Sequence, residues 1–175
     1  MESKTIREAI SGNTEALSQL INSYKDIAYN LALSIAKNKE DAKDITQDSL
    51  LKVLENIERF RNESKFSTWL YKIVYNQSIK HVKSHKTRTY IDIDSLANFK
   101  DPNAIDSNDE LYNSLYKAID NLEDMERNII ILFYLADKSI KQINIITGLS
   151  ISNIKVILHR ARKKLYKNLE YEEAG

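Results

Sequence analysis

The chain has 175 residues, of which 42% are hydrophobic and 29% charged, and its formal net charge is +1 at pH 7. This composition is typical of a soluble folded protein with one sizeable domain or two small ones, and excludes a disordered chain. Without cysteine there is no disulfide framework, and without a signal-peptide pattern or a membrane-length apolar run we expect a cytoplasmic protein with no direct membrane insertion.

Glycine and proline are rare, with three and one in the whole chain. Such a chain cannot build glycine-rich phosphate loops or many tight hairpins, so the sequence predicts an all-α fold.

Charge is strongly segregated along the chain. Residues 61–90 carry seven Lys or Arg and one acid, residues 91–130 carry ten acids and three bases, and residues 155–167 carry six bases and no acid. Two basic blocks around an acidic stretch favour a polyanionic partner over a uniformly solvated surface.

Three helices are predicted in the first half of the chain. Residues 14–37 repeat apolar side chains every three or four positions, and residues 41–58 do so after the polar break NKED, with Leu50, Val53 and Leu54 expected inside. After RFRNESK, Ser67 or Thr68 is expected to cap a third helix.

Periodicity then fails between residues 87 and 108, where the only proline lies among Asp, Asn and Ser. We therefore expect one domain at residues 1–88 and another at 109–175, joined by an acidic flexible linker at 89–108. The acid excess either mimics nucleic acid or belongs to a simple solvated tether.

The second half predicts helices at 111–122, 124–136 and 139–147, then a turn at Gly148 and a last helix capped by Ser150. This order is typical of a helix-turn-helix. The last helix combines an inward apolar stripe with many bases, which favours DNA binding over a purely structural bundle. The stripe consists of Ile154, Leu158, Ala161 and Leu165.

Aromatic residues alternate with bases in the middle block FRNESKFSTWLYKIVYNQSIKHVKSHK. Single-stranded nucleic acid is bound by this combination, because bases stack on rings while phosphates attract cations. The alternative is an ordinary helical core, which we favour at least in part for Trp69. The aromatic residues are Phe60, Phe66, Trp69, Tyr71 and Tyr75.

No catalytic constellation is found, so we expect neither an enzyme nor a small-molecule substrate or cofactor. His81 and His85 are four residues apart, but no carboxylate or thiol on the same turn completes a zinc site. We expect them to be polar surface groups near phosphate.

Two stretches resemble one known family. DAKDITQDSLLKVLENIERFRNESKFSTWLYKIVYNQSIKHVK resembles domain two of the extracytoplasmic-function (ECF) group of sigma-70 RNA polymerase sigma factors, and LEDMERNIIILFYLADKSIKQINIITGLSISNIKVILHRARKKL resembles domain four. The resemblance implies a two-domain all-α alternative sigma factor that binds core RNA polymerase and directs promoter-specific initiation. It also implies an anti-sigma partner. A stand-alone helix-turn-helix regulator is the main alternative.

Functional residues follow by position from this resemblance. Contacts to the β′ clamp helices of polymerase are implied for Asp41, Asp44, Gln47, Asp48, Leu51 and Glu55, and domain four would also meet the β flap. Contacts to the minus-ten element, including a loop at 62–68 that takes a flipped base, are implied for Arg61, Asn62, Glu63, Ser64, Lys65, Phe66, Ser67, Thr68, Trp69, Lys80 and Lys83.

The last helix is implied to lie in the major groove of the minus-thirty-five element. Lys155, Val156, His159 and Arg160 are expected nearest the bases, and Arg162, Lys163 and Lys164 at phosphates, with Ser152 and Asn153 completing the set. The family pattern is not matched everywhere. Asn62 stands in place of a glycine, Asn144 of an alanine, Asn153 of a threonine, and Val156 and Ile157 of a small polar residue and an arginine.

Overall fold

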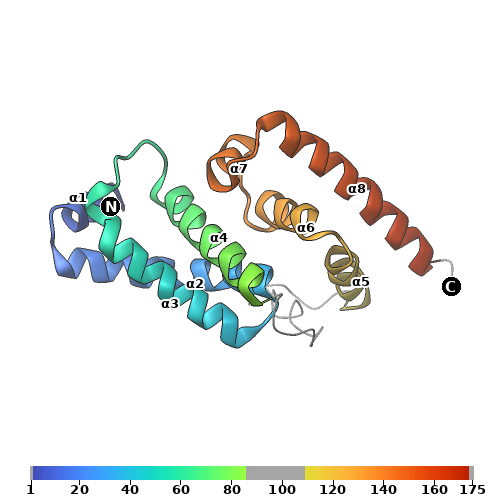
Figure 1. The fold of residues 1–175 in the computed structure, drawn as a ribbon, viewed down its shortest axis with the longest axis horizontal. Helices are drawn as coiled ribbons and strands as arrows, with labels where there is room; N and C mark the ends of the chain where they lie inside the picture. The colour runs from blue at the N-terminus through green and yellow to red at the C-terminus, as the bar shows by residue number, and fades with distance from the viewer. Residues whose placement is uncertain (1, 86–108, 174–175) are drawn as a thin grey trace. The chain divides into compact units, whose positions relative to one another are not determined.

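The computed structural model describes residues 2–85 and 109–173, and every regular element in these ranges is helical (Figure 1). The chain divides into two compact units, Met1–Ile93 (unit 1) and Asp94–Gly175 (unit 2). The all-α prediction is therefore confirmed. The expected linker at 89–108 lies outside the described residues.

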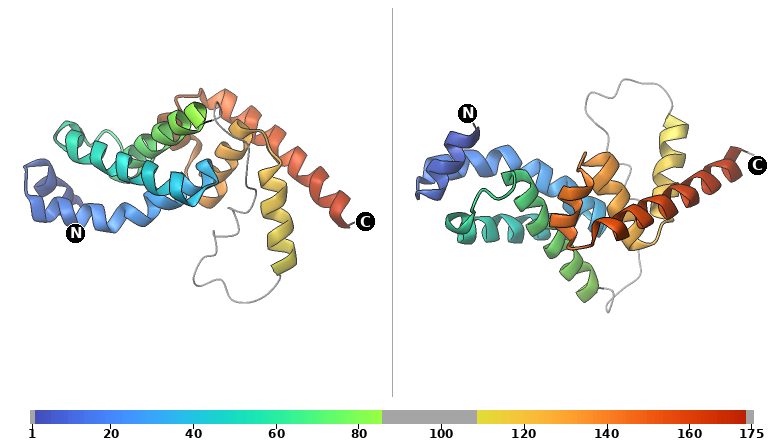
Figure 2. Two further views of the ribbon diagram at one scale, coloured as in Figure 1. Left: turned by 60° about the horizontal axis from the view of Figure 1, so that its bottom comes forward. Right: turned by 90° about the horizontal axis from the view of Figure 1, so that it is seen from above.

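Unit 1 is built around its second helix, which contacts each of the other three (Figure 2). The third and fourth helices also pack on each other. The elements are α1 (Glu2–Ile10), α2 (Thr14–Ala36), α3 (Lys39–Asn56), a short 3-10 turn η1 (Ile57–Arg59) and α4 (Phe66–His85).

Asparagine caps begin the two central helices. The Oδ1 atoms of Asn13 and Asn38 each accept two hydrogen bonds from backbone N–H groups of the first turns of α2 and α3, at 2.8–3.0 Å. These caps satisfy donors that have no partner inside a helix. Lys37 ends α2 in the left-handed conformation, with φ 58°. The observed bounds of both helices agree closely with the predicted ranges.

Small residues let these helices approach closely. Ala32 and Ala42 are fully buried, as are Ser34, Ser49 and Ser78. Each serine hydroxyl donates to a backbone carbonyl three or four residues earlier in its own helix, at 2.6–2.9 Å, so these three buried hydroxyls all have a partner.

The inward face of α3 differs from the prediction at one position. Val53 is buried and Leu50 half-buried, as expected, but Leu54 is 40% exposed. Successive helical residues point about 100° apart, so Leu54 is turned away from the direction of Val53. Leu54 is therefore a surface residue of α3.

The first helix, α1, was not predicted. Its sequence ESKTIREAI has few apolar residues, and an isolated helix of this length is marginal in water. In the structure α1 packs on α2 and η1, and this packing buries Ile6 and Ala9. Tertiary contact, not a long apolar stripe, stabilises this helix.

Unit 2 is organised by its long last helix, which contacts the three helices before it. The predicted helix at 124–136 is interrupted: its second part is a π-helical turn. The elements are α5 (Asp109–Asp120), α6 (Asp124–Ile130), the π turn η3 (Ile131–Leu135), α7 (Ile140–Thr147) and α8 (Ile151–Glu173).

The turn between α7 and α8 confirms the predicted helix-turn-helix. Gly148 ends α7 with φ 75°, a left-handed conformation that favours glycine. The Ser150 hydroxyl accepts a hydrogen bond from the Asn153 backbone N–H at 3.2 Å and so caps α8. Asn144 donates from Nδ2 to the Leu149 carbonyl oxygen at 2.7 Å. This contact gives the departure at Asn144 a structural role inside the turn.

None of the helices in the described ranges combines the length and the apolar character that crossing a membrane requires.

Candidate functional site

An exposed mixed surface lies along α3. Asp44, Gln47 and Asp48 are exposed, as is Glu55 about two turns after Asp48, and Leu51 between them is 48% exposed. Between α2 and α3 this surface is hollowed into a shallow groove of about 430 Å³. The groove is lined by Ile21, Lys25, Asp26, Tyr29, Lys43, Thr46, Gln47, Leu50, Leu51 and Leu54. Acidic and apolar groups therefore meet on one accessible face.

Asp41 differs from the other carboxylates predicted for this surface. Its Oδ1 lies 3.0 Å from His81 Nε2 of α4, and both side chains are largely covered. The pair joins the start of α3 to α4 within unit 1. The structure thus gives Asp41 an internal partner, and it places His81 in this contact instead of on the open surface expected for it.

The aromatic block is mostly core. Phe60, Phe66, Tyr71 and Tyr75 are each at most 8% exposed, and burial raises the pKa of the Tyr71 hydroxyl. Phe66 packs against Tyr24, Phe60 and Trp69, with ring centroids 5.1–5.7 Å apart. The stacking-platform interpretation is therefore wrong for these four residues. Trp69 is half-buried, as favoured.

The aromatic cluster holds both ends of a short polar loop. Phe60 and Phe66 are buried at its two ends, and between them Arg61, Asn62, Glu63 and Lys65 are exposed. Thr68 is 1% exposed and lies inside α4, whose first residue is Phe66, so neither Ser67 nor Thr68 caps this helix. Phe66 anchors the end of the loop among buried rings, and the Thr68 backbone N–H donates to the Lys65 carbonyl oxygen at 2.9 Å, whereas the side chains of these four loop residues are exposed.

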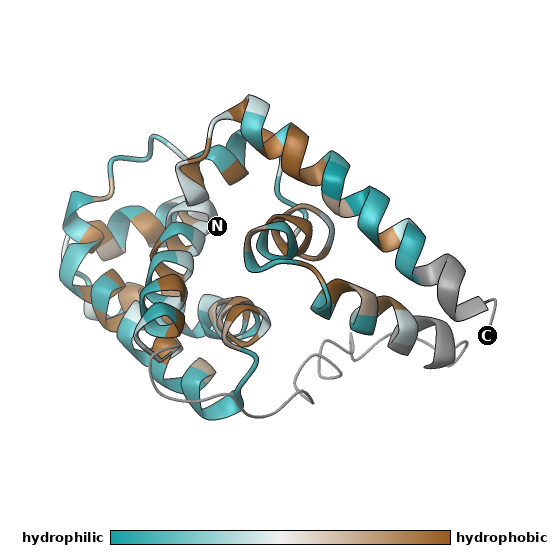
Figure 3. Cartoon of the chain, turned by 45° about the vertical axis from the view of Figure 1, so that its right-hand side comes forward, coloured by the Kyte–Doolittle hydropathy of each residue, from teal (hydrophilic) through white to brown (hydrophobic). Residues whose placement is uncertain are grey.

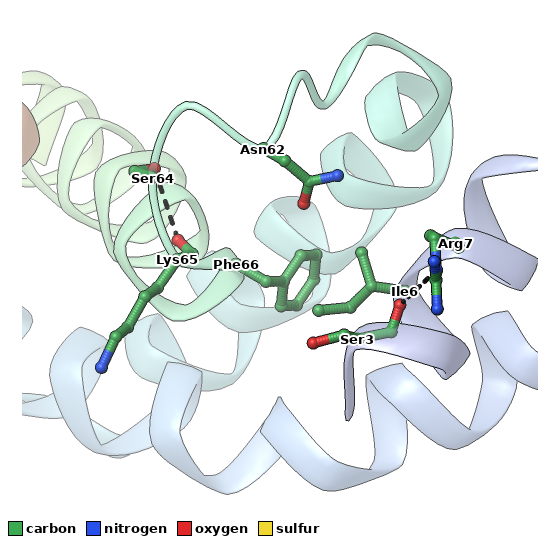
Figure 4. A pocket seen from close by; sticks show the side chains of 7 residues that line it. All are labelled: Ser3, Ile6, Arg7, Asn62, Ser64, Lys65 and Phe66. Atoms are coloured by element: carbon green, nitrogen blue, oxygen red, sulfur yellow. Dashed lines mark hydrogen bonds between the residues drawn. The ribbon is translucent and has the colours of Figure 1, made fainter. Parts of the chain in front are cut away.

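The loop and α1 line a half-open cavity of about 480 Å³, whose lining side chains Figure 4 shows. Asn62, Ser64, Lys65 and Phe66 come from the loop and the start of α4. The opposite wall is made by Ser3, Ile6 and Arg7 of α1. The sequence pattern pointed to the loop side only, because nothing in a helix more than fifty residues earlier indicates that it packs there.

Basic side chains continue from this loop along α4. Lys72, Lys80 and Lys83 are exposed. The basic side chains predicted for this part of unit 1 are therefore on its surface.

The last helix separates its apolar and polar residues as predicted, and Figure 3 shows the two kinds alternating along it. Ile154, Leu158 and Ala161 are fully buried, while Leu165 is half-buried. The opposite face is open. Its exposed residues are Ser152, Asn153, Lys155, Val156, His159, Arg160, Arg162 and Lys163.

Lys164 points elsewhere. Its Nζ lies 2.8 Å from a carboxylate oxygen of Glu126 and 3.1 Å from one of Glu123, both in or next to α6. Hydrogen bonds to Glu126 and then Glu123 raise the pKa of Lys164 above its ordinary value of 10.5. A phosphate contact by Lys164 would have to compete with two carboxylates, so Lys163 is the better placed of the two lysines.

Both units match known families. The family described as Sigma-70 region 2 matches residues 20–88, and Sigma-70, region 4 matches residues 112–165. RNA polymerase sigma factor SigV of Bacillus subtilis is 32% identical over 156 residues, which cover 87% of this chain and 90% of SigV. The chain belongs to the ECF group of sigma-70 sigma factors.

Other relatives agree. ECF RNA polymerase sigma factor SigW of Bacillus subtilis is 29% identical and covers 97% of both chains. Two solved structures share the fold. CnrH, in complex with the cytosolic domain of CnrY, has a TM-score of 0.70 at 20% identity over 95% of this chain and 96% of its own. The sigma factor RpoE of Bartonella quintana, in complex with the anti-sigma factor NepR, has a TM-score of 0.69 at 24% identity over 87% and 96%.

This sigma factor binds core RNA polymerase and directs promoter-specific transcription initiation. Sigma factors are initiation factors, not enzymes.

The unusual Asn62 has a conformational explanation. Its φ is 55°, in the left-handed region where glycine is unstrained and asparagine is the best tolerated of the other residues. We expect Asn62→Val to destabilise unit 1 by about 1–2 kcal/mol and Asn62→Gly to leave it within a few tenths of a kcal/mol. Urea titrations followed by Trp69 fluorescence would measure both. Equal stability of the two variants would show that the loop does not require this conformation.

The Lys164 ion pairs predict a stability effect within this sigma factor. Replacing Lys164 with methionine keeps the aliphatic stem but leaves the Glu126 carboxylate, which is 9% exposed, without its cation. We expect a lower Tm at pH 7, partly restored by adding Glu126→Gln. Because the pKa of Lys164 is raised on folding, the stabilisation is complete below pH 10.5 and is lost at higher pH. Melting curves that differ equally from wild type at pH 7 and pH 11.5 would contradict this assignment.

Proposed function

We propose that the two units divide promoter recognition and polymerase binding between separate surfaces. Unit 1 binds polymerase through α3 and the minus-ten element through loop 61–65, and unit 2 reads the minus-thirty-five element through α8. The observation that carries this proposal is that all three surfaces are exposed, two in the unit that matches Sigma-70 region 2 and one in the unit that matches Sigma-70, region 4. Run-off transcription from a cognate promoter, with core polymerase alone as the control, tests the whole assignment.

The polymerase surface is the exposed face of α3. Leu51 and Leu54 supply an apolar centre, and Asp44, Asp48 and Glu55 supply an acidic surround. An apolar centre within a polar rim is the usual anatomy of a protein interface, and the acids suit a basic helical partner such as the β′ clamp helices. Asp41 is left out of this surface because it contacts His81.

Replacing Gln47 and Asp48 together with alanine is expected to weaken binding to core polymerase by at least about tenfold. Both side chains are exposed, so helicity and Tm should not change. Pull-down titrations against core enzyme measure the effect. The matched control is the double alanine variant of Ser18 and Gln19, which are exposed on α2 and do not line the groove. Unchanged affinity of the Gln47 and Asp48 variant would remove α3 from the interface.

The minus-ten surface is the loop with its cavity. Arg61, Asn62, Glu63 and Lys65 are exposed on a loop whose two ends are anchored by buried rings. A loop held in this way can receive an unstacked base without first becoming ordered. The exposed Lys80 and Lys83 on α4 would attract the backbone phosphates.

The minus-thirty-five surface is the exposed side of α8. Lys155, Val156, His159 and Arg160 lie in its first half, where side chains of a recognition helix reach base edges. Arg162 and Lys163 follow and suit phosphates. In the assembled polymerase, unit 2 would also meet the β flap.

We further propose control by an anti-sigma factor in the cytoplasm, where core polymerase is found. Two of the solved structures that share this fold are of complexes, CnrH with the cytosolic domain of CnrY and RpoE with the anti-sigma factor NepR. The exposed apolar residues Leu51 and Leu54 offer an anti-sigma factor a surface that polymerase also needs. Competition between core polymerase and a co-purified inhibitor for the chain would test this control.

A further inference from the structure

The cavity between α1 and the loop has one wall that lies outside the residues matching Sigma-70 region 2. The match to Sigma-70 region 2 begins at residue 20, whereas Ser3, Ile6 and Arg7 lie on α1. Figure 4 shows Ile6 next to the Phe66 ring, with Arg7 beyond Ile6 on the same helix, and all three α1 residues line the cavity. A side chain of α1 is therefore close enough to contact a ligand that binds to the loop.

The cavity suits a single nucleobase. Its volume of about 480 Å³ is within the usual range for a small-ligand pocket. Ile6 and Phe66 are mostly buried and line the cavity only with the small part of their apolar surface that stays exposed, 7% and 3%, while the remaining lining residues are polar. A flipped base needs both, because its face is apolar and its edge carries hydrogen-bonding groups.

The polar lining is rich in donors. Arg7 and Lys65 can only donate, and none of the seven described residues that line the cavity carries a carboxylate. Arg7 is exposed, and its Nε donates to the Ser3 carbonyl oxygen of its own helix at 3.2 Å, a hydrogen bond that does not involve its two Nη groups, which form a planar fork of donors. Such a fork matches a base edge with two acceptors, above all O6 and N7 of guanine.

We propose that α1 completes the minus-ten base pocket and that Arg7 selects a base with a ring carbonyl oxygen, with guanine the best match. This rests on the proposed function of the loop as the receiver of a flipped base. Arg7 is then a specificity residue that lies outside the residues matching the two sigma-70 regions, 20–88 and 112–165.

The test uses polymerase holoenzyme reconstituted with the full chain and a promoter library randomised across the minus-ten element. Bound and unbound fragments are sequenced. We expect Arg7→Ala to reduce the preference at one position by about tenfold while other positions keep theirs, and Arg7→Lys to behave similarly because it keeps the charge without the fork. The control is Lys4→Ala, which removes a charge from the same helix but does not line the cavity and pairs with Glu8 at 3.7 Å.

Two outcomes would overturn the proposal. The preference at every position could survive in Arg7→Ala, or all sequences could weaken alike with a smaller salt dependence, which would make Arg7 a phosphate contact. Asn62→Gly separates this failure from a failure of the loop assignment, because it removes the amide while keeping the backbone conformation. If Asn62→Gly relaxes one position and Arg7→Ala does not, only the role of Arg7 is wrong. If neither relaxes any position, the base pocket itself is wrong.

Discussion

Replacing Phe66 with alanine is expected to destabilise unit 1 by about 3–5 kcal/mol, the usual cost of removing a buried aromatic ring. Phe66 is 3% exposed and contacts three other rings, Tyr24, Phe60 and Trp69. The loss would be a large fraction of the stability of a unit of this size. Trp69 is the only tryptophan of the chain and belongs to the same cluster, so its fluorescence reports unfolding of unit 1 in the full-length protein.

The same variant separates two roles of Phe66. If the ring only positions the loop, minus-ten binding should be lost as the variant unfolds. Binding should then return at low temperature, where the variant is folded. Lys65→Ala, next in sequence but exposed, is the control and should leave the unfolding transition unchanged. A Phe66→Ala variant that is as stable as wild type but binds no minus-ten DNA would show direct contact with a base instead.

Helices with long apolar repeats were predictable from the sequence, and the reason is local. The ranges 14–37 and 41–58 carry the helical repeat over several turns, and this spacing agrees to within two or three residues with the observed α2 and α3, which Asn13 and Asn38 cap. The turn at Gly148 has a similar local cause, since its φ of 75° favours glycine. By contrast, α1 depends on contacts with α2 and η1, and no local pattern reveals such contacts.

The sequence was enough to predict which segments form the candidate sites. It was not enough to predict which side chains of those segments are exposed. An alternation of aromatic and basic residues is compatible with a stacking surface and with a helical core, and only the packing of Phe60, Phe66 and Tyr71 decides for the core. In the same way, Lys163 and Lys164 are equivalent in a charge count. Lys164 forms ion pairs with Glu123 and Glu126, which lie about forty residues earlier in the chain. These ion pairs can be recognised only once α6 and α8 are packed together.

Arg160 and Lys163 are expected to play different roles in binding the minus-thirty-five element. Both are exposed on α8, and Lys163 lies seven residues after Val156, so it shares the face opposite the buried stripe but sits two turns further along. We expect Arg160→Ala to change which minus-thirty-five sequences are bound, by about 5- to 150-fold at one position. Lys163→Ala should instead lower affinity for all sequences alike and reduce the slope of log affinity against log salt by roughly one unit.

Binding titrations at several salt concentrations, on matched and mutated upstream elements, would measure both effects. Lys164→Ala is the matched control: because its Nζ already contacts Glu123 and Glu126, it should alter the salt slope less than Lys163→Ala does. If Arg160→Ala and Lys163→Ala weaken every sequence equally, α8 contacts phosphates only. Specificity would then have to come from the loop of unit 1, or from Val156, whose exposed methyl groups suit the methyl group of thymine.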